Sequence, residues 1–543
     1  MNITGAEWIV RLLEEQGVTT VAGVPGGAVL PLYDALARSS IRHVLARHEQ
    51  GAAFIAQGIA RSTGRAAVCL ASSGPGATNL MTALADAKLD SVPLVCITGQ
   101  VPTCLIGTDA FQEVATVAMA QPITKACFCV EEASQLGDAI TRAFAIAQSG
   151  RPGPVLIDVP KDVQLAPVRP LASSCCVITP ARIRDRYDDV CEMLRASHRP
   201  LFYLGGGVVK SGAQTIVREL CERTSIPAVC TLMALGVLPD EHPLNLGMLG
   251  MHGARYTNAA VDECDLLIAI GARFDDRATG RIEAFAPRAR IVHIDIDPRE
   301  IGKLKHVDIG IVDDALSAAR ALLDRVMTAP RHEWLSRVAE LRTTLPLKRS
   351  SGSRLAHDAI RAVAAHAGTD AFVTTDVGQH QMWVAQSYPF HRADRWLTSG
   401  GLGTMGFGLP TAIGVALAHP DASVLCFTGD GSLLMNVQEL ATLAELRANV
   451  KIVLFDNAAL GLVHQQQQLF YGGAVMASRY AKPSDFIAIA RAFGIRAGEV
   501  DDTNEWQTTL SVPGPALLRV AIDVNAHVMP MVAPGAANVE ALE

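Results

Sequence analysis

One stretch, residues 423–457, constrains the fold more than any other part of the sequence. The apolar run at 424–427 has the length of a buried strand and ends in a Gly-Asp-Gly turn at 429–431. Apolar residues then recur at helical spacing over 432–447, which predicts one helix, and a second apolar run follows at 451–455. A strand, a turn, a helix and a further strand form the repeating unit of a parallel α/β sheet.

Two polar side chains follow the ends of these predicted strands, Asp430 after the first and Asn457 after the second. In an open α/β sheet, ligands bind at the edge formed by the carboxyl ends of the strands. Gly429 and Gly431 let the backbone approach a phosphate closely, and the amides that open the helix attract an anion. Mg²⁺ takes few protein oxygens when phosphate completes its shell. The stretch therefore predicts a site for a diphosphate carried on Mg²⁺, whereas Gly-Asp-Gly alone would indicate only a turn.

The length and charge of the chain limit the classes of protein that it can belong to. At 543 residues it is too long for one core and predicts about three domains. Its formal charge of −7 and the lack of a basic block argue against nucleic acid or an anionic membrane as partner. No apolar run reaches the length of a membrane span, and the N-terminus begins an amphipathic helix instead of a signal peptide. Its 12 cysteines lack metal-ligand spacing, which favours buried thiols in the cytoplasm.

The two ends of the chain contain matching segments. Residues 151–159 and 512–520 share the frame Pro-Gly-Pro-x-Leu-x-x-Val. The plan of strand, Gly-x-Gly turn, helix and strand at 66–98 recurs at 423–455. Because both matches occur in the same order, they predict two outer domains of one topology.

A third α/β unit lies between the two outer domains. In it, a predicted strand at 200–204 runs into three glycines at 205–207, and a later strand at 291–297 ends in an acidic residue. This arrangement suits a nucleotide, although the glycines do not form the G-x-G-x-x-G fingerprint and a plain glycine turn is an equal alternative. A Pro/Ser-rich linker is expected at 167–179 and a connector at 328–355. We therefore expect three doubly wound parallel-sheet domains, at 1–165, 185–328 and 355–525, and a terminal arm at 526–543.

Glu49 stands in the sequence Arg-His-Glu-Gln-Gly, directly before a predicted helix at 50–61 that is rich in small residues. A glutamate at this position is common because it interacts favourably with the positive end of the helix dipole. Its place in the sequence therefore leaves a structural and a catalytic role equally open.

Motifs along nearly the whole chain resemble one enzyme family. They include the Gly-Asp-Gly turn followed after 25 residues by Asn457, and the sequences Arg-His-Glu49-Gln-Gly, Ser-Gly-Pro-Gly-Ala-Thr-Asn79, Gly-Met-Leu-Gly-Met251-His252 and Leu-Gly403-Thr-Met405-Gly. In this order they resemble the catalytic large subunits of acetohydroxyacid synthase (acetolactate synthase), which depend on thiamine diphosphate, and within that family the isozyme-I-like branch.

The resemblance implies a function and a set of partners. The expected reaction joins two pyruvates, or pyruvate and 2-ketobutyrate, to give 2-acetolactate or 2-aceto-2-hydroxybutyrate with loss of CO2. This is the first common step of branched-chain amino acid biosynthesis. The implied cofactors are thiamine diphosphate, Mg²⁺ and FAD. The family forms homodimers or homotetramers with active sites at the subunit interface, works with a small regulatory subunit and is cytoplasmic.

The resemblance also implies a role for individual residues. Glu49 would hydrogen-bond the N1′ atom of the thiamine pyrimidine ring. The reaction centre would be lined by Gly27, Phe111, Gln112 and Lys161, and the second substrate would be bound by Arg277 and Gln466. Mg²⁺ would be bound by Asp430, Asn457 and the carbonyl of Ala459. The rest of the thiamine cofactor would be held by Gln379, His380, Gly403, Met405, Gly431 and Ser432. FAD would contact Arg151, Gly205, Gly206, Gly207, Thr231, Leu232, Met233, Met251, His252, Gly271, Arg273, Asp275, Asp295, Ile296 and Asp314.

Two alternatives remain. The first is another thiamine diphosphate-dependent 2-keto acid decarboxylase or carboligase. Those decarboxylases lack the combination of Gln112, Lys161 and Arg277, and glyoxylate carboligase lacks the glutamate present here as Glu49. The second is a non-catalytic homologue, which predicts damage at Glu49, Asp430 or Asn457, and all three are intact.

Gln466 departs from the pattern of most biosynthetic members of the family, which carry a tryptophan at this position. That tryptophan favours 2-ketobutyrate by packing on its extra methyl group. One methylene in an apolar pocket is worth about 1–3 kcal/mol, so losing a flat apolar wall would erase much of the preference.

We therefore predict that the enzyme makes mainly acetolactate. With equimolar pyruvate and 2-ketobutyrate, the ratio of the two products measures the preference directly. A strong excess of acetohydroxybutyrate would contradict the role assigned to Gln466.

Overall fold

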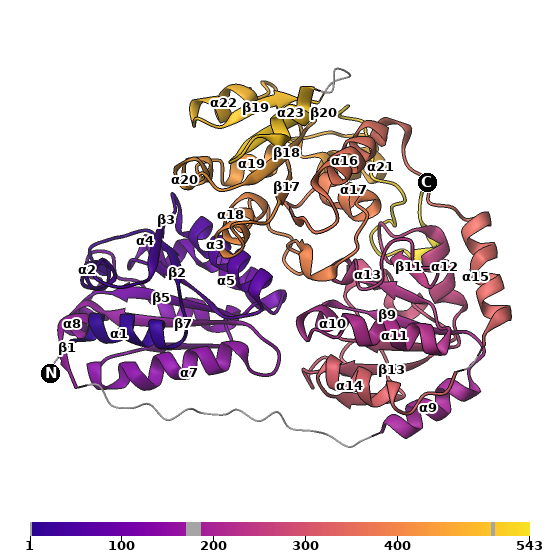
Figure 1. The fold of residues 1–543 in the computed structure, drawn as a ribbon, viewed down its shortest axis with the longest axis horizontal. Coiled ribbons are helices and arrows are strands. Elements are labelled where there is room, and N and C mark those ends of the chain that lie inside the picture. The colour runs from indigo at the N-terminus through magenta and orange to yellow at the C-terminus, as the bar shows by residue number, and fades with distance from the viewer. Residues whose placement is uncertain (1–2, 170–185, 329, 501–504) are drawn as a thin grey trace.

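The computed structural model describes residues 3–169, 186–328, 330–500 and 505–543. Three six-stranded sheets form three lobes, with the N-terminal lobe at the lower left of Figure 1, the central lobe at the right and the C-terminal lobe at the top. All strand pairs within these sheets are parallel. The predicted fold class, three parallel-sheet α/β domains, is confirmed.

The N-terminal sheet has the order β3-β2-β4-β5-β7-β6. Its strands are β2 (Thr20–Gly23), β3 (Arg42–Leu45), β4 (Ala67–Ala71), β5 (Leu94–Gln100), β6 (Ala126–Cys129) and β7 (Pro154–Pro160). The helices of this lobe are α1 (Gly5–Glu15), α2 (Leu30–Leu36), α3 (Glu49–Thr63), α4 (Pro75–Asn79), α5 (Met81–Leu89), α6 (Thr116–Ala120), α7 (Leu136–Gln148) and α8 (Lys161–Leu165).

The C-terminal sheet repeats this topology, with the order β16-β15-β17-β18-β20-β19. Its strands are β15 (Phe372–Thr375), β16 (Trp396–Leu397), β17 (Val424–Gly429), β18 (Val450–Asp456), β19 (Arg496–Glu499) and β20 (Ala516–Ala521). Its helices are α16 (Arg354–Ala367), α17 (Gln379–Ser387), α18 (Gly408–Ala418), α19 (Asp430–Met435), α20 (Glu439–Leu446), α21 (Gly461–Phe470), α22 (Phe486–Ala492) and α23 (Glu505–Ser511). The two Pro-Gly-Pro segments lead into β7 and β20, the corresponding strands of the two sheets, so the predicted common topology is confirmed.

The central sheet has the order β11-β10-β9-β12-β13-β14. Its strands are β9 (Pro200–Leu204), β10 (Ala228–Cys230), β11 (Asn245–Met248), β12 (Leu266–Ile270), β13 (Arg290–Asp295) and β14 (Ile309–Val312). Its helices are α9 (Tyr187–Ala196), α10 (Gly206–Lys210), α11 (Gln214–Thr224), α12 (Arg255–Glu263), α13 (Asp276–Thr279), α14 (Ala315–Leu323) and α15 (His332–Thr344). Counted along the chain, this is the order 3-2-1-4-5-6 of dinucleotide-binding folds, in which the ligand binds where the order reverses, here between β9 and β12.

The structure differs from the sequence prediction at three places. The helix expected over 432–447 is two helices, because Asn436 leaves helical geometry and its Nδ2 donates a hydrogen bond to Gly406 O at 2.7 Å. The connector at 328–355 contains α15, which buries Trp334 against the central domain. In the linker at 167–179, β8 (Pro167–Val168) pairs with β1 (Ile3–Thr4), and residues 170–179 lie outside the described residues.

The described part of the C-terminal arm lies between two lobes. Val528 N donates a hydrogen bond to Gln465 Oε1 at 2.8 Å, and Val532 N donates one to Met251 O at 3.0 Å. The arm therefore connects α21 of the C-terminal lobe to the Met251–His252 turn of the central lobe. Among the described residues, no helix has both the length and the apolar character needed to cross a bilayer.

Helices α3 and α18 join the N-terminal and C-terminal lobes and lie side by side in Figure 1. They occupy corresponding places in the two repeated topologies, each before the third strand of its sheet. A Cβ atom on Gly58 would lie 2.1 Å from Thr411 O, and one on Gly414 would lie 2.0 Å from Ile55 O. The two helices can approach this closely only because both residues lack a side chain.

We predict that Gly58→Ala destabilises the protein by about 1–3 kcal/mol, because the added methyl group cannot fit between the helices. Urea unfolding followed by circular dichroism measures the change. The control is Gly137→Ala in α7, where the nearest atom to the new Cβ would be 3.4 Å away. There the better helix propensity of alanine is expected to leave stability equal or slightly higher. Equal stability of Gly58→Ala and the unmodified protein would contradict the packing argument.

Candidate active site

Asp430 joins the ends of two neighbouring strands of the C-terminal sheet. It follows β17 directly, and its Oδ1 accepts a hydrogen bond from Gly431 N at 2.8 Å. Its Oδ2 accepts one from Ala459 N, in the loop after β18, at 3.1 Å. Burial, together with the nearby Asp456 carboxylate, raises the pKa of Asp430 to about 7. The charged form of such a buried carboxylate is strongly stabilised by a bound cation that neutralises it.

Asn457 and Gln379 form the second side of the same site. Asn457 Nδ2 donates a hydrogen bond to Gln379 Oε1 at 3.0 Å, and Asn457 Oδ1 accepts one from Ala459 N at 3.2 Å. Gln379 Nε2 donates in turn to Gln465 Oε1 at 3.0 Å and to Ala526 O at 2.7 Å. This network holds the Asn457 oxygen close to Asp430, as a shared cation requires.

The residues around this site fit a polar ligand, because they include an unsatisfied polar group and leave open space beside it. The ring Nε2 of His380 is buried without a hydrogen-bond partner. Burial lowers the pKa of His380 to about 3, so its ring is neutral near pH 7. We call the space around Asp430 and Asn457 the cradle. A Cβ atom on Gly431 would lie 2.6 Å from the Tyr480 hydroxyl, so only glycine leaves the cradle open there. Ser432, by contrast, donates its hydroxyl hydrogen to Val377 O at 2.7 Å.

No group of three or more His, Cys, Asp or Glu residues in the described chain is arranged to hold a metal ion. A Mg²⁺ ion bound together with a diphosphate does not need such a group, because phosphate oxygens and water fill most of its shell. Asp430, Asn457 and the carbonyl of Ala459 are therefore a sufficient protein contribution, and their role stays a prediction.

The loop that carries Gly403 and Met405 lies against the cradle. The Met405 methyl carbon is 3.6 Å from the position that a Cβ on Gly431 would take. Gly406 N and Phe407 N donate hydrogen bonds to Asp376 Oδ1 at 2.7 and 3.0 Å. Asp376 is fully buried, so the loop is fixed to the end of β15.

Glu49 is the first residue of α3, at the carboxyl edge of the N-terminal sheet. Its Oε2 accepts a hydrogen bond from Asn79 Nδ2 at 2.9 Å, and a Cβ on Gly76 would lie 3.3 Å from its Oε1. Asn79 had no role in the sequence analysis, although it ends one of the quoted motifs. Among the described residues, no hydrogen bond or ion pair links Glu49 to the Asp430 cradle of its own chain.

The other residues expected at the reaction centre also lie on the N-terminal lobe. Phe111 is 87% exposed, and Gln112 has a positive φ of 61°. The Gln112 backbone packs on Gly74, since a Cβ there would lie 3.0 Å from the Gln112 Cα. Lys161 begins α8 directly after β7, and a Cβ on Gly27 would meet no atom within 4 Å. An exposed phenylalanine beside a strained residue is a surface suited to contact with another molecule.

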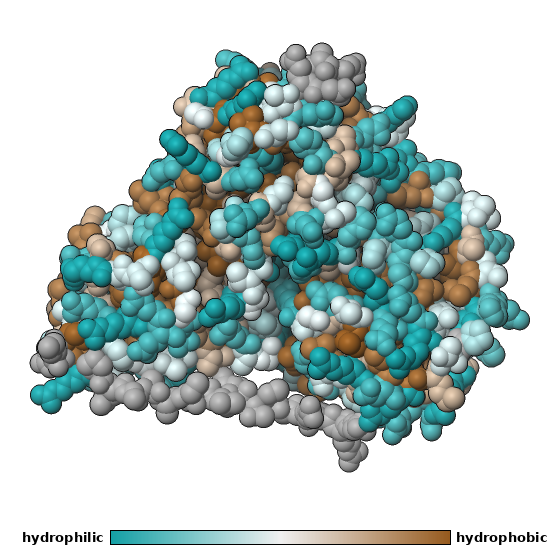
Figure 2. Space-filling view, in the orientation of Figure 1, coloured by the Kyte–Doolittle hydropathy of each residue, from teal (hydrophilic) through white to brown (hydrophobic). Residues whose placement is uncertain are grey.

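A cavity of about 840 Å³ opens where the three lobes meet. In the space-filling view, a hollow with hydrophilic residues at its rim lies near the middle of the molecule (Figure 2). All the residues expected to contact FAD line this cavity except Gly205. Gly205 instead packs backbone to backbone, because a Cβ on it would lie 2.1 Å from Gly271 O.

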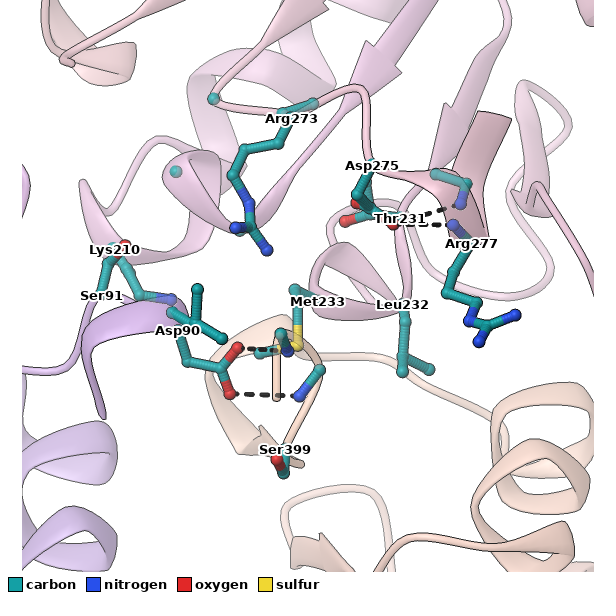
Figure 3. A pocket seen from close by; sticks show the side chains of 18 of the residues that line it. Asp90, Ser91, Lys210, Thr231, Leu232, Met233, Arg273, Asp275, Arg277 and Ser399 are labelled. Carbon is teal, nitrogen blue, oxygen red and sulfur yellow. Dashed lines mark hydrogen bonds between the residues drawn. The ribbon is translucent and has the colours of Figure 1, made fainter. Parts of the chain in front are cut away.

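The geometry of the cavity fits a dinucleotide. It lies beyond β9 and β12, where the strand order of the central sheet reverses. The Thr231 hydroxyl is buried there without a hydrogen-bond partner. Burial raises the pKa of Asp295, at the end of β13, to about 6. In Figure 3, Arg273 points into the cavity and Thr231 and Asp275 lie on its wall.

The two residues expected to bind the second substrate line the same cavity, together with Gly403. Arg277 Nη1 lies 3.7 Å from Met251 Sδ, and its Nε lies 3.7 Å from the Asp276 carboxylate. This exposed ion pair is weak, so the Arg277 guanidinium is available to a carboxylate ligand. Gln466, on α21, is half-buried. The structure thus brings Arg277, Gln466 and Gly403 together but leaves Glu49 and Phe111 on a separate surface of the chain.

Comparison with known proteins gives consistent matches along the chain. Residues 3–119 match the thiamine pyrophosphate enzyme N-terminal TPP binding domain, 187–322 the central domain and 376–520 the C-terminal TPP binding domain. The chain is 54% identical over 550 residues to the acetolactate synthase isozyme 1 large subunit of Escherichia coli (strain K12), covering 99% of this chain and 97% of that protein.

Two further relatives are similar over all or nearly all of their length. The acetolactate synthase isozyme 2 large subunit of the same organism is 45% identical over 552 residues, which cover 100% of both chains. The probable acetolactate synthase large subunit of Methanocaldococcus jannaschii is 44% identical over 558 residues, which cover 98% of this chain and 94% of that one.

Proposed function

Because the chain belongs to the acetolactate synthase large subunits, a family of thiamine pyrophosphate enzymes, we propose that it condenses two pyruvates to 2-acetolactate with loss of CO2. The observation that carries this proposal is the Asp430–Asn457 cradle, found at the strand ends that the sequence predicts, within a chain similar to these enzymes over its full length. Another thiamine-dependent decarboxylase is not favoured, since the relatives matched over the whole chain are acetolactate synthases. The product places the enzyme in branched-chain amino acid biosynthesis.

The cradle is proposed to hold thiamine diphosphate with Mg²⁺. Bound there, the cofactor supplies the nucleophilic carbon that adds to the keto group of pyruvate. Asp430, Asn457 and the Ala459 carbonyl would bind the cation, and the free His380 Nε2 would donate a hydrogen bond to the diphosphate group. The Met405 side chain, next to Gly431, would support the cofactor from its other side.

Glu49 is proposed to share a proton with the N1′ atom of the cofactor pyrimidine. The Asn79 amide donates to one carboxylate oxygen of Glu49, which leaves the other oxygen for this contact. A carboxyl group fixed in this way keeps its proton at one position, as general acid–base catalysis requires. Arg277 would bind the carboxylate of the second keto acid, and Gln466 would leave space beside it without a strong preference for an extra methyl group.

FAD is proposed to occupy the cavity between the lobes. The support is the reversal of strand order at β9 and β12, the glycine turn after β9, and the unsatisfied Thr231 hydroxyl. Arg151 connects this cavity to the N-terminal lobe, because its Nη1 is 2.8 Å from Glu300 and its Nε donates to Ser91 Oγ at 2.8 Å.

The active form is proposed to be a homodimer or homotetramer in the cytoplasm, with Glu49 of one subunit facing the cradle of another. Its support is the separation of Glu49 and the exposed Phe111 from the cradle within one chain. A small regulatory subunit is a further proposed partner, since the relatives are named large subunits.

We predict that Glu49→Gln lowers acetolactate formation from pyruvate at least about 100-fold, because an amide cannot share the proton of the ring. The assay contains thiamine diphosphate, Mg²⁺ and FAD, and product is measured colorimetrically. The control is Glu15→Gln, an exposed residue of the same lobe, which should keep full activity. Acetaldehyde as the sole product, or no consumption of pyruvate by the unmodified chain, would overturn the proposed reaction.

We also predict that two inactive variants, Glu49→Gln and Asp430→Asn, restore activity when their subunits are mixed. A hybrid dimer then has one site that carries both changes and one intact site, so a 1:1 mixture should regain about a quarter of full activity. Subunits are mixed after mild dissociation, and unmixed variants treated in the same way are the controls. Activity that stays at the level of the controls would mean that Glu49 and Asp430 act within one chain.

A further inference from the structure

Lys210 ends α10 and enters the cavity from the central lobe. Its side chain folds back over the glycine turn, so that its Nζ lies 3.5 Å from the position of a Cβ on Gly206. In Figure 3, Lys210 lies beside Asp90 on the cavity wall, and Arg273 reaches into the same space from above. No role was assigned to Lys210 in the sequence analysis.

The positive charge of Lys210 has no partner in the described part of the chain, where no acceptor lies within hydrogen-bond or ion-pair distance of its Nζ. The same holds for the guanidinium of Arg273. Asp90, the carboxylate that lies beside Lys210, already accepts hydrogen bonds from Arg61 Nη2 at 2.9 Å and from Gly401 N at 2.7 Å. The charge of Asp90 is therefore already neutralised by other donors.

Four other carboxylates that line the cavity are also satisfied by donors of their own. Asp295 accepts from Asp297 N at 2.9 Å, and Asp314 accepts from Leu316 N at 2.9 Å. Asp275 accepts from Arg277 N at 3.2 Å, and Asp313 accepts from the Tyr187 hydroxyl at 2.7 Å. Among the described residues, these acids thus have donors, whereas Lys210 and Arg273 have no acceptor, which favours an anion as their partner.

The surroundings of Lys210 make an uncompensated cation unfavourable. The Lys210 side chain is exposed to the cavity, and desolvation by the surrounding protein is the largest effect that lowers its pKa to about 8. Arg61, Arg151 and Arg273 contribute to this lowering of the pKa, while Asp90 opposes it. A cluster of like charges that converges on one space is typical of a site for a multiply charged anion.

We propose that Lys210 binds the diphosphate of the flavin dinucleotide in this cavity, together with Arg273. This inference rests on the proposed binding of FAD and names the residue that recognises its charged centre. Gly206 and Gly207 line the cavity beside Lys210, and the absence of side chains there lets the diphosphate approach the ammonium group.

The first test is FAD affinity, measured by flavin fluorescence on the full chain after removal of bound flavin. Lys210→Met should weaken FAD binding about 10- to 100-fold, because it removes a charge-assisted hydrogen bond to the diphosphate. Lys210→Arg should stay within about three-fold of the unmodified chain, since it keeps the charge. The control is Lys305→Met, outside the cavity on the same lobe, where Lys305 donates to Ile282 O. FAD binding by Lys210→Met equal to that of the unmodified chain would overturn the proposal.

The second test is the pH dependence of FAD affinity, which a purely structural role of Lys210 would not change. The groups that face Lys210 are Asp90, Arg61, Arg151 and Arg273, and the three arginines keep their charge at all relevant pH values. A bound anion favours the protonated amine, so the affinity of the unmodified chain should be constant below pH 8 and fall as the pH rises from 8 to 9.5. Lys210→Arg should show no fall.

The two tests separate the failure of this inference from the failure of the proposed function. A fall in affinity above pH 8 that persists in Lys210→Arg would overturn the role of Lys210 alone. An unmodified chain that binds no FAD would overturn the flavin site and Lys210 together. Acetolactate formation, measured in its own assay, would still decide the proposed reaction.

Discussion

The packing of α3 against α18 sets the relative position of the two outer lobes, because these helices approach until backbone meets backbone at Gly58. The same interface contains the buried carboxylate of Glu439. Its Oε1 accepts hydrogen bonds from Arg47 N at 3.0 Å and from His48 N at 3.1 Å. Both amides lie just before α3, so the C-terminal lobe fixes the start of the helix that presents Glu49. Loss of this contact would leave a buried carboxylate and two amides unsatisfied.

A second buried junction connects the cavity to the cradle. Arg61 Nη2 lies 3.1 Å from an Asp86 oxygen and 2.9 Å from an Asp90 oxygen, and these side chains are almost completely buried. Asp86 accepts a hydrogen bond from the Ser399 hydroxyl, and Asp90 accepts from the amides at 400 and 401. Removing one partner from such a group would strand a charge in the interior. The junction therefore holds the loop that lines the cavity with Gly403 and reaches the cradle with Met405.

Much of the fold and part of the candidate site could be predicted from the sequence, because strands and their ends have local signals. The apolar run before Asp430 and the glycines around it required no knowledge of distant residues. The break at Asn436 could not be predicted in this way, since it depends on a hydrogen bond to Gly406, far away in the chain. The contact of Asn79 with Glu49 was missed for the same reason, although both residues stood in quoted motifs.

The sequence by itself determined the order of the strands along the chain, the repetition of one topology at its two ends, and the polar residues that follow each strand. It did so because apolar periodicity and glycine turns depend only on neighbouring residues. Only the tertiary structure decided that Arg277, Gln466 and Gly403 line one cavity. It also decided that, in the part of the chain that the structure describes, Lys210 has no hydrogen-bond or ion-pair acceptor, because Asp90 is occupied by Arg61 and backbone amides. Such groupings depend on packing between segments hundreds of residues apart, which no local pattern records.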